Sequence, residues 1–328
     1  MDRENTNGDR PRVLVTQRLP SAVERELSLR FAADLSADDH ILSEDDLVAA
    51  AREYDALLPT VTNRLTPRVF GAATRLKIAA NFGVGVDSID LDAARAAGVI
   101  VTNTPGVLAE CTADLTMALI LAVLRRIGEG ERLVRAGQWT GWRPTYLLGR
   151  RVCGKTLGII GFGGIGQAVA RRAALGFGMP ILVSSRRPPD PAALAAIGGT
   201  AVDLETLLGG ADIVSLHCPL TSETRRLINA ERLAMMGREA VLINTARGAL
   251  VDEPALIAAL ESGRIAGAGL DVFDQEPLVP AGLLAMENVV VLPHLGSGTE
   301  ETRTAMGMRA LANLEAFFVG EAPPDRVV

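Results

Sequence analysis

The sequence predicts an α/β protein built from two domains, each a doubly wound parallel β-sheet covered by helices. Short runs rich in Val, Ile and Leu alternate with helix-length segments, which is typical of βαβ units. The 328 residues exceed what one hydrophobic core usually serves. The apolar runs also form two series, separated by one long helical segment, so we expect two sheets.

The first series has β-rich runs at residues 13–15, 56–58, 76–80 and 99–101. Stretches rich in Ala, Leu and Glu lie between them and predict helices, for example at residues 44–52 and 91–97, and Gly98 ends the second of these. Because strands joined through helices run parallel, this series predicts the first sheet.

The segment at residues 110–136 mixes leucines with small residues and predicts one long helix, broken near Gly128 or Gly130. Both tryptophans of the chain, Trp139 and Trp142, follow within a polar turn. They either pack locally, contact another subunit or cover a ligand.

The second series is denser and predicts about six strands, including residues 156–160, 181–183, 213–216, 241–243, 266–270 and 289–293. An S-x-x-E pattern at residues 297–300 then predicts the start of a final helix that reaches about residue 319. This helix could cross back to the first domain, so we place that domain at residues 1–107 and 292–328 and the second at 108–291.

Composition and charge exclude several classes of protein. A formal net charge of −6 argues against a nucleic-acid binder, which needs clustered Lys and Arg. The three cysteines are widely spaced and show no CxxC pattern, which favours free thiols in a reducing compartment. The N-terminus is polar, and no segment offers the roughly 18 uninterrupted apolar residues of a membrane span. We expect a cytoplasmic protein without nucleic-acid or membrane partners.

A G-x-G-x-x-G loop follows the predicted strand at 156–160 and precedes a predicted helix, a context that indicates a dinucleotide-binding Rossmann domain. Gly161 allows the tight turn, and Gly163 lets a pyrophosphate approach the backbone. Gly166 lets helix and strand pack closely, with the helix N-terminus facing the negative charge.

The end of the next strand indicates which dinucleotide is bound. NAD-selective proteins generally carry an Asp or Glu there, whereas this chain has Ser185, Arg186 and Arg187. Two guanidiniums can hold a phosphate that a carboxylate would repel, which favours NADP(H) over NAD. The alternative is that the arginines form a solvated face. An extra glycine before Met179 also leaves the register open by one residue.

Three side chains at predicted strand ends supply what hydride reduction of a 2-keto acid requires. Arg247 offers a planar cation for the substrate carboxylate, His294 a proton donor, and Glu276 a carboxylate that orients the imidazole and favours its charged form. Open α/β sheets bind ligands at the carboxyl ends of their strands. We therefore expect these three groups to form a catalytic site.

Each residue also has a simpler interpretation when taken alone: an ion pair for Arg247 or Glu276, and a structural group for His294. Their combination beside the glycine loop favours catalysis. No second His, Cys or paired carboxylate accompanies His294, so no metal site is expected. His217 either lines the cofactor groove or simply ends its strand, and we expect His40 in a solvated loop.

From about residue 13 to residue 320, the chain resembles the D-isomer-specific 2-hydroxyacid dehydrogenases. The resemblance rests on residues 81–87 (NFGVGVD), 103–106 (NTPG), 161–166 (GFGGIG), 244–248 (NTARG), 269–273 (GLDVF), 276–277 (EP) and 293–297 (PHLGS). Within that family it looks most similar to the glyoxylate/hydroxypyruvate reductases, because residues 139–144 and 182–188 match their usual sequences.

The resemblance implies that residues 108–291 are the Rossmann domain and that the other domain is a flavodoxin-like substrate and catalytic domain. It implies that the Val84 and Gly85 amides bind the substrate carboxylate with Arg247, while His294 protonates the carbonyl. Trp142 would reach the substrate pocket of a neighbouring subunit, which implies a homodimer. The implied cofactor site comprises Thr112, Gly161, Gly163, Gly164, Ile165, Gly166, Ser185, Arg186, Arg187, His217, Pro219, Thr224, Thr245, Ala246, Asp271 and Gly296.

The leading functional hypothesis is NADPH-dependent reduction of glyoxylate to glycolate and of hydroxypyruvate to D-glycerate. A second hypothesis keeps this chemistry but assigns a bulkier 2-keto acid, such as 2-ketogluconate or an aryl pyruvate. A third, from another class, is a dinucleotide-sensing binding protein like the transcriptional corepressors that share this fold. The presence of all three catalytic groups argues against the third.

Overall fold

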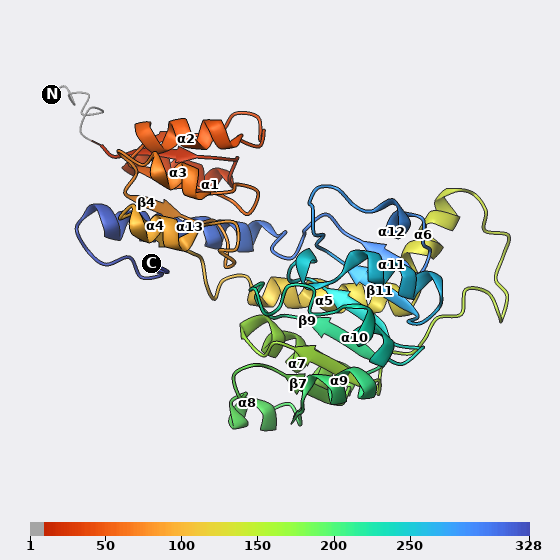
Figure 1. The fold of residues 1–328 in the computed structure, drawn as a ribbon. Helices are drawn as coiled ribbons and strands as arrows, with labels where there is room; N and C mark the ends of the chain where they lie inside the picture. Colours follow the sequence, from red (N-terminus) through yellow and green to blue (C-terminus); the bar gives the residue numbers. More distant parts are fainter. Residues whose placement is uncertain (1–9) are drawn as a thin grey trace. The chain divides into compact units, whose positions relative to one another are not determined.

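A computed structural model describes residues 10–328 of the chain (Figure 1). These residues form two compact units. Unit 1 comprises the described residues up to Leu108 together with Thr299–Val328, and unit 2 comprises Ala109–Gly298. Each unit contains one parallel β-sheet, which confirms the predicted fold class.

Unit 1 contains, within the described residues, a five-stranded sheet in the order β2-β1-β3-β4-β5, the order of flavodoxin-like sheets. Its strands are β1 (Arg12–Val15), β2 (Ala32–Asp34), β3 (Ala56–Leu58), β4 (Ile78–Ala80) and β5 (Ile100–Thr102). Its helices are α1 (Ser21–Arg30), α2 (Glu44–Glu53), α3 (Pro67–Gly71), α4 (Leu91–Ala96) and α13 (Glu300–Phe318).

Both faces of the unit 1 sheet are covered, because successive side chains of a strand point to opposite faces. Val13 and Val15 of β1 pack with residues of α1 and α13, whereas Leu57 of β3 packs with residues of α2 and α3. Unit 1 therefore includes a helix from the far end of the chain. That helix begins later than the S-x-x-E pattern predicted, because Thr299 and not Ser297 caps it by accepting the N–H of Thr302.

Unit 2 contains, within the described residues, a seven-stranded parallel sheet in the order β12-β11-β10-β9-β6-β7-β8. This is a Rossmann arrangement, in which the order of the strands changes direction between β6 and β9. Its strands are β6 (Leu157–Ile160), β7 (Ile181–Ser184), β8 (Thr200–Ala201), β9 (Ile213–Leu216), β10 (Val241–Asn244), β11 (Gly267–Leu270) and β12 (Val289–Val291). Its helical segments are α5 (Ala109–Leu124), α6 (Ile127–Arg135), α7 (Gly164–Phe177), α8 (Pro191–Ala195), α9 (Leu204–Gly210), α10 (Ala230–Met235), η1 (Gly248–Leu250), α11 (Glu253–Glu261) and α12 (Ala281–Leu284).

The long helix predicted at residues 110–136 is two helices. The break lies at Arg126, two residues before Gly128 and so near the predicted position, and Arg126 is in the left-handed region with φ of 54°. The Arg126 guanidinium donates to both oxygens of Glu129 at 2.8 and 2.7 Å and so holds the first turn of α6. The chain thus changes direction between α5 and α6 at an arginine whose side chain contacts Glu129, and not at a glycine.

Residues 292–298 group with unit 2, although they were predicted to belong to the other domain. Backbone hydrogen bonds explain the difference, since the N–H groups of Leu292 and His294 donate to the carbonyls of Leu270 and Asp271. These bonds continue the pairing of β11 with β12 beyond the end of the strand. In residues 10–328, no helix is both long and apolar enough to cross a membrane.

Candidate active site

The glycine loop joins β6 to α7 as the sequence predicted, and two of its glycines are required by close packing. Gly161 has φ of +94°, and a Cβ there would lie 2.6 Å from the backbone nitrogen of Cys218. A Cβ on Gly166 would lie 2.2 Å from the carbonyl oxygen of Gly161. Any larger side chain at either position would separate the loop from its neighbours.

Gly163 differs, because a Cβ there would meet no atom within 4 Å. It is the N-cap of α7, which spans 14 residues, and no side chain of residues 10–328 caps this helix end. Gly164 and Ile165 form the first helical positions, so free backbone N–H groups face the open space beside Gly163. This opening and the helix dipole fit the pyrophosphate of a dinucleotide.

The strand register places Ser185 beside this loop. Ser184, the last residue of β7, pairs with Ile160, and its carbonyl accepts the N–H of Gly161 at 2.8 Å. Arg186 and Arg187 follow and are exposed, while the Ser185 hydroxyl donates to the carbonyl of Arg187. Gly178 caps the C-terminus of α7 in the left-handed region, which accounts for the extra glycine noted in the sequence.

The loop after β9 lies against the glycine loop. His217 donates its backbone N–H to Ile160, and its Nε2 atom lies 2.8 Å from the hydroxyl of Ser215. Burial lowers the pKa of the His217 imidazole to about 3, so it is neutral at physiological pH. Burial raises the pKa of the Cys218 thiol to about 11, so this thiol is a poor nucleophile.

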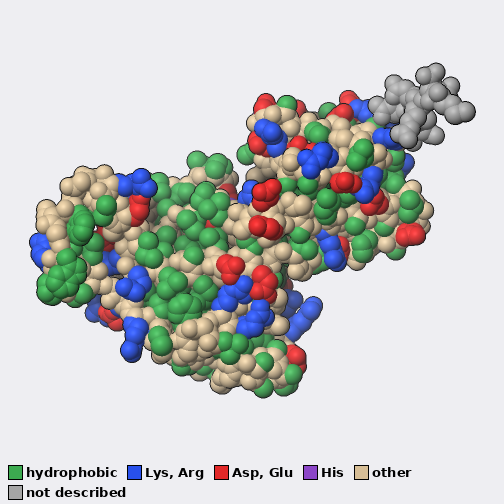
Figure 2. All heavy atoms as spheres, turned by 180° about the vertical axis from the view of Figure 1, so that it is seen from behind, with side chains coloured by type: hydrophobic (Ala, Val, Ile, Leu, Met, Phe, Trp, Pro, Cys, Tyr) green, Lys and Arg blue, Asp and Glu red, His purple; other side chains and the backbone are tan. Residues whose placement is uncertain are grey.

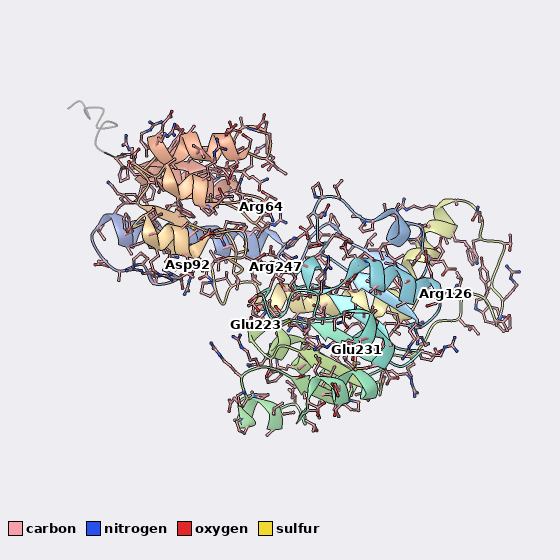
Figure 3. All side chains as sticks on the ribbon, in the orientation of Figure 1. Arg64, Asp92, Arg126, Glu223, Glu231 and Arg247 are labelled. Carbon is pink, nitrogen blue, oxygen red and sulfur yellow. The ribbon has the colours of Figure 1, made fainter. Side chains whose placement is uncertain are left out.

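Further along this loop, the Thr224 hydroxyl donates to the carbonyl of Pro219 at 2.7 Å. Glu223, labelled in Figure 3, has a pKa below its ordinary value, chiefly because the Thr221 hydroxyl donates to it, and the charge of Arg186 contributes. Arg186 therefore lies close enough to this loop for its charge to act there.

Arg247, labelled in Figure 3, follows β10 in a turn that Asn244 holds. The Asn244 carboxamide accepts the N–H of Ala246 at 3.0 Å and donates to the carbonyl of Arg247 at 2.8 Å. A Cβ on Gly248 would lie 1.9 Å from the carbonyl carbon of Phe273, so this turn packs directly on the segment that leads to Glu276. Sequence reasoning did not assign a role to Asn244, although it lies within the NTARG motif.

Glu276 and His294 form a direct pair. The Nδ1 atom of His294 lies 2.8 Å from Oε2 of Glu276, and Oε1 accepts the backbone N–H of Phe273 at 3.0 Å. Burial opposes the charged form of Glu276, yet the hydrogen bond and charge of His294, with smaller contributions from Phe273 and Arg247, bring its pKa below the ordinary value. Because this carboxylate is ionised at neutral pH, Nδ1 of His294 carries the proton of their hydrogen bond. Nε2 is the ring nitrogen that does not contact Glu276.

The His294 backbone has φ of 54°, a left-handed conformation that costs a non-glycine residue about 1–2 kcal/mol. Asp271, which is 0% exposed, holds the turn, because its two carboxylate oxygens accept the N–H groups of Leu295 at 2.6 Å and Gly296 at 2.8 Å. The Thr112 hydroxyl donates to the Gly296 carbonyl at 3.0 Å. Two of the predicted residues, Asp271 and Thr112, thus both contact Gly296 in the turn that carries the histidine.

A buried hydroxyl pair joins α5 to the end of β10. The Thr116 and Thr245 hydroxyls lie 2.9 Å apart, and the Thr116 hydroxyl also donates to the carbonyl of Thr112. Thr112 in turn contacts the His294 turn, so α5 connects the segments that carry Arg247 and His294. The sequence carried no local signal for Thr116, which lies in the middle of a helix.

Val84 and Gly85 lie in unit 1, in a loop after β4. The side chain of Val84 is exposed at 37%. Among residues 10–328, no backbone carbonyl accepts the N–H groups of Val84 and Gly85, and their own carbonyls accept side-chain amides from Asn103 and Asn81.

The segment between α6 and β6 carries both tryptophans on its surface. Trp139 is 57% and Trp142 is 81% exposed. Figure 2 shows green hydrophobic side chains on the part of unit 2 where this segment lies in Figure 1. Local packing, one of the three interpretations of the tryptophan pair, therefore does not cover Trp142 within a single chain.

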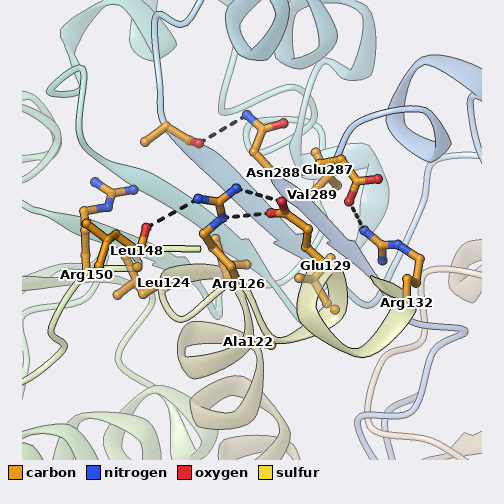
Figure 4. A pocket seen from close by; sticks show the side chains of 15 residues that line it. Ala122, Leu124, Arg126, Glu129, Arg132, Leu148, Arg150, Glu287, Asn288 and Val289 are labelled. Atoms are coloured by element: carbon orange, nitrogen blue, oxygen red, sulfur yellow. Dashed lines mark hydrogen bonds and ion pairs between the residues drawn. The ribbon is translucent and has the colours of Figure 1, made fainter. Parts of the chain in front are cut away.

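A cavity of about 260 Å³ lies at the amino ends of β11 and β12, the edge of the sheet opposite His294 (Figure 4). Its three arginines are paired: Arg126 with Glu129, Arg132 with Glu287, and Arg150 with Glu239. These carboxylates offset the cations that an anionic ligand would need. Among residues 10–328, no group of three or more His, Cys, Asp or Glu side chains is arranged to hold a metal ion.

Comparison with known proteins shows which proteins this chain is similar to. Residues 117–296 match the D-isomer specific 2-hydroxyacid dehydrogenase, NAD binding domain. Glyoxylate reductase from Thermococcus litoralis is 46% identical over 322 residues, which cover 97% of each chain. A crystal structure of a protein from Thermus thermophilus is 48% identical with a TM-score of 0.88, covering 97% of this chain and 100% of that one. An NADPH-dependent glyoxylate/hydroxypyruvate reductase from Sinorhizobium meliloti, solved with NADP and malonate, is 36% identical with a TM-score of 0.85, covering 98% and 97%.

Proposed function

Since this chain belongs to the D-isomer-specific 2-hydroxyacid dehydrogenases, we propose that it reduces glyoxylate to glycolate and hydroxypyruvate to D-glycerate with NADPH. The coarser activity follows from the family: the protein is an oxidoreductase of the glyoxylate reductase type that reduces 2-keto acids with NAD(P)H. The observation that carries the proposal is the 2.8 Å contact between His294 and Glu276 in the NAD-binding unit.

The open space at Gly163 and the uncapped N-terminus of α7 support a pyrophosphate site. Arg186 and Arg187 are exposed at the end of β7, where a 2′-phosphate would lie, and this supports NADPH over NADH. NADPH supplies the hydride when it is bound. The proposed cofactor site also includes Thr112, Gly161, Gly164, Ile165, Gly166, Ser185, His217, Pro219, Thr224, Thr245, Ala246, Asp271 and Gly296.

The chain's own residues bind the substrate and move a proton. The Arg247 guanidinium and the N–H groups of Val84 and Gly85 bind the substrate carboxylate. His294 protonates the carbonyl oxygen through Nε2, because Nδ1 is engaged by Glu276. The Glu276 carboxylate keeps the ring in one orientation and stabilises the imidazolium before the proton is transferred.

The exposed Trp142 supports a homodimer in which this side chain reaches the substrate pocket of the neighbouring subunit. A large aromatic side chain on the surface loses contact with water when a second copy covers it. We place this dimer in the cytoplasm. Sedimentation of the purified protein as a monomer at micromolar concentration would contradict the assignment of a dimer.

The test is oxidation of NADPH, followed by its absorbance, on mixing the protein with a panel of 2-keto acids. We expect turnover with glyoxylate and hydroxypyruvate, and slower turnover with NADH. Preference for 2-ketogluconate or an aryl pyruvate would support a bulkier substrate instead. Tight binding of NADPH without turnover of any 2-keto acid would support a dinucleotide-sensing protein.

A further inference from the structure

Two asparagine side chains hold three consecutive carbonyls of the loop after β4. The Asn81 carboxamide nitrogen donates to the carbonyls of Gly83 at 3.0 Å and Gly85 at 2.9 Å. The Asn103 carboxamide nitrogen donates to the carbonyl of Val84 at 2.9 Å. Every carbonyl from residue 83 to residue 85 is therefore bound by a side-chain amide.

Fixing these carbonyls also fixes the direction of the N–H groups that follow them. In a planar trans peptide, the C=O of one residue and the N–H of the next point in opposite directions. The Val84 N–H therefore points away from Asn81, because the Gly83 carbonyl points toward it. By the same argument, the Gly85 N–H points away from Asn103.

Asn81 is well placed for this role. It is 0% exposed and follows β4, with its backbone N–H bound to the carbonyl of Thr102. Both hydrogens of its amide are used by the loop, while its Oδ1 atom has no hydrogen-bond partner among the described residues. A Cβ on Gly83 would lie 3.3 Å from the Asn81 nitrogen, so the glycine leaves this amide room to reach two carbonyls.

We propose that Asn81 and Asn103 are positioning residues that hold the Val84 and Gly85 N–H groups in the orientation that binds the substrate carboxylate. This inference rests on the proposed function, in which these two amides contact the substrate. Without the asparagines, the peptide units at residues 83–85 are free to rotate, so the Val84 and Gly85 N–H groups lose their fixed directions. The effect falls on the affinity for the carboxylate and not on the cofactor.

The experiment compares wild type with Asn81→Leu, which keeps most of the side-chain volume but donates no hydrogen bond. We expect the KM for glyoxylate and the Ki of oxalate, a competing dicarboxylate, to rise at least about tenfold, while the KM for NADPH changes less than about twofold. In hydrogen-exchange measurements, oxalate should slow the exchange of the amides at residues 84–86 less than it does in wild type.

Asp55→Ala is the matched control. Asp55 is a buried polar residue that precedes β3, at the amino ends of the strands, whereas Asn81 lies at the carboxyl end of β4 in the same sheet. Asp55 accepts the N–H of Arg12 and pairs with Arg75. This variant should lower Tm without changing the KM for glyoxylate or the Ki of oxalate. A folded Asn81→Leu variant with unchanged values for both would overturn the proposal.

Asn103→Ala covers the case in which Asn81→Leu does not fold, because Asn103 is only half-buried and releases a single carbonyl. An increase in the Ki of oxalate supports the proposal, and an unchanged Ki overturns it. Turnover by the wild type tests the proposed function separately. If the wild type reduces no 2-keto acid, that function fails, while amide exchange at residues 84–86 still decides whether the asparagines order the loop.

Discussion

Nδ1 of His294 lies 2.8 Å from Oε2 of Glu276, and the other oxygen of that carboxylate accepts the backbone N–H of Phe273 at 3.0 Å. The glutamate is thus held by its own loop on one side and orients the imidazole on the other. The pKa of Glu276 falls below its ordinary value even though burial opposes its charge. An ionised partner at neutral pH is what a histidine proton donor requires.

Replacing Glu276 with Gln tests this pair. A neutral amide stabilises the imidazolium less than a carboxylate, so we expect the pH above which keto-acid reduction declines to move downward. The rate at neutral pH should fall roughly 10²-fold. The measurement is the pH profile of kcat/KM. Glu253→Gln is the control, because Glu253 accepts the N–H of Asp274 on the same segment. A profile that Glu276→Gln leaves unchanged would show that Glu276 is not the partner.

Replacing Arg186 and Arg187 together with Ala tests the choice of cofactor. Both arginines are exposed beyond β7, so their loss should leave the fold intact. We expect the KM for NADPH to rise by at least about tenfold and that for NADH much less, because only NADPH carries the 2′-phosphate. Equal changes for the two cofactors would contradict the phosphate-binding assignment.

Asp271→Asn tests what holds His294 in its left-handed conformation. An amide cannot accept both the Leu295 and Gly296 N–H groups, because its NH₂ would face one of them. We expect kcat to fall on the order of 10²-fold, since small displacements of a catalytic group have effects of this size. Asp212→Asn is the control, because Asp212 accepts the N–H of Thr156 at the amino edge of the same sheet. A loss of Tm in both variants with equal kcat would refute the role of Asp271.

Asp325 predicts how the stability of unit 1 depends on pH. The hydrogen bonds from Arg309, at 2.7 Å to each oxygen, lower the pKa of Asp325, while burial opposes this. A carboxyl group whose pKa is lower in the folded state adds stability above its unfolded pKa of about 3.8, and this is lost as the pH falls through the folded value.

Asp325→Asn should therefore lower the free energy of unfolding at neutral pH by about 1–3 kcal/mol, a range reduced because Arg309 is partly exposed. The difference from wild type should shrink below about pH 4, where wild-type Asp325 becomes protonated. Denaturant titrations across this range measure it. A difference that stays constant with pH would mean that the charge of Asp325 contributes nothing.

The fold class and the family could be predicted from local sequence patterns, without knowledge of contacts between distant residues. Continuous apolar runs between helix-length segments predicted both sheets, because a strand that is covered on both faces needs apolar residues at nearly every position. The glycine loop was recognisable because its requirements, a tight turn and a close helix, apply to residues within about six positions of one another. Two strands were missed, β2 and the two-residue β8, because neither is long or apolar enough to produce a pattern.

What the sequence determined by itself is therefore local: the order of strands and helices, the glycine loop, and the placing of Arg247, Glu276 and His294 after three strands. Only the tertiary structure decided how these residues are held. The Thr112 hydroxyl reaches Gly296 across 184 positions of the chain, and Asp271 reaches it across 25. Such contacts leave no periodic signal, because they depend on which strands become neighbours in the sheet. For the same reason, the left-handed His294 and the side-chain amides that hold residues 83–85 became visible only in the folded protein.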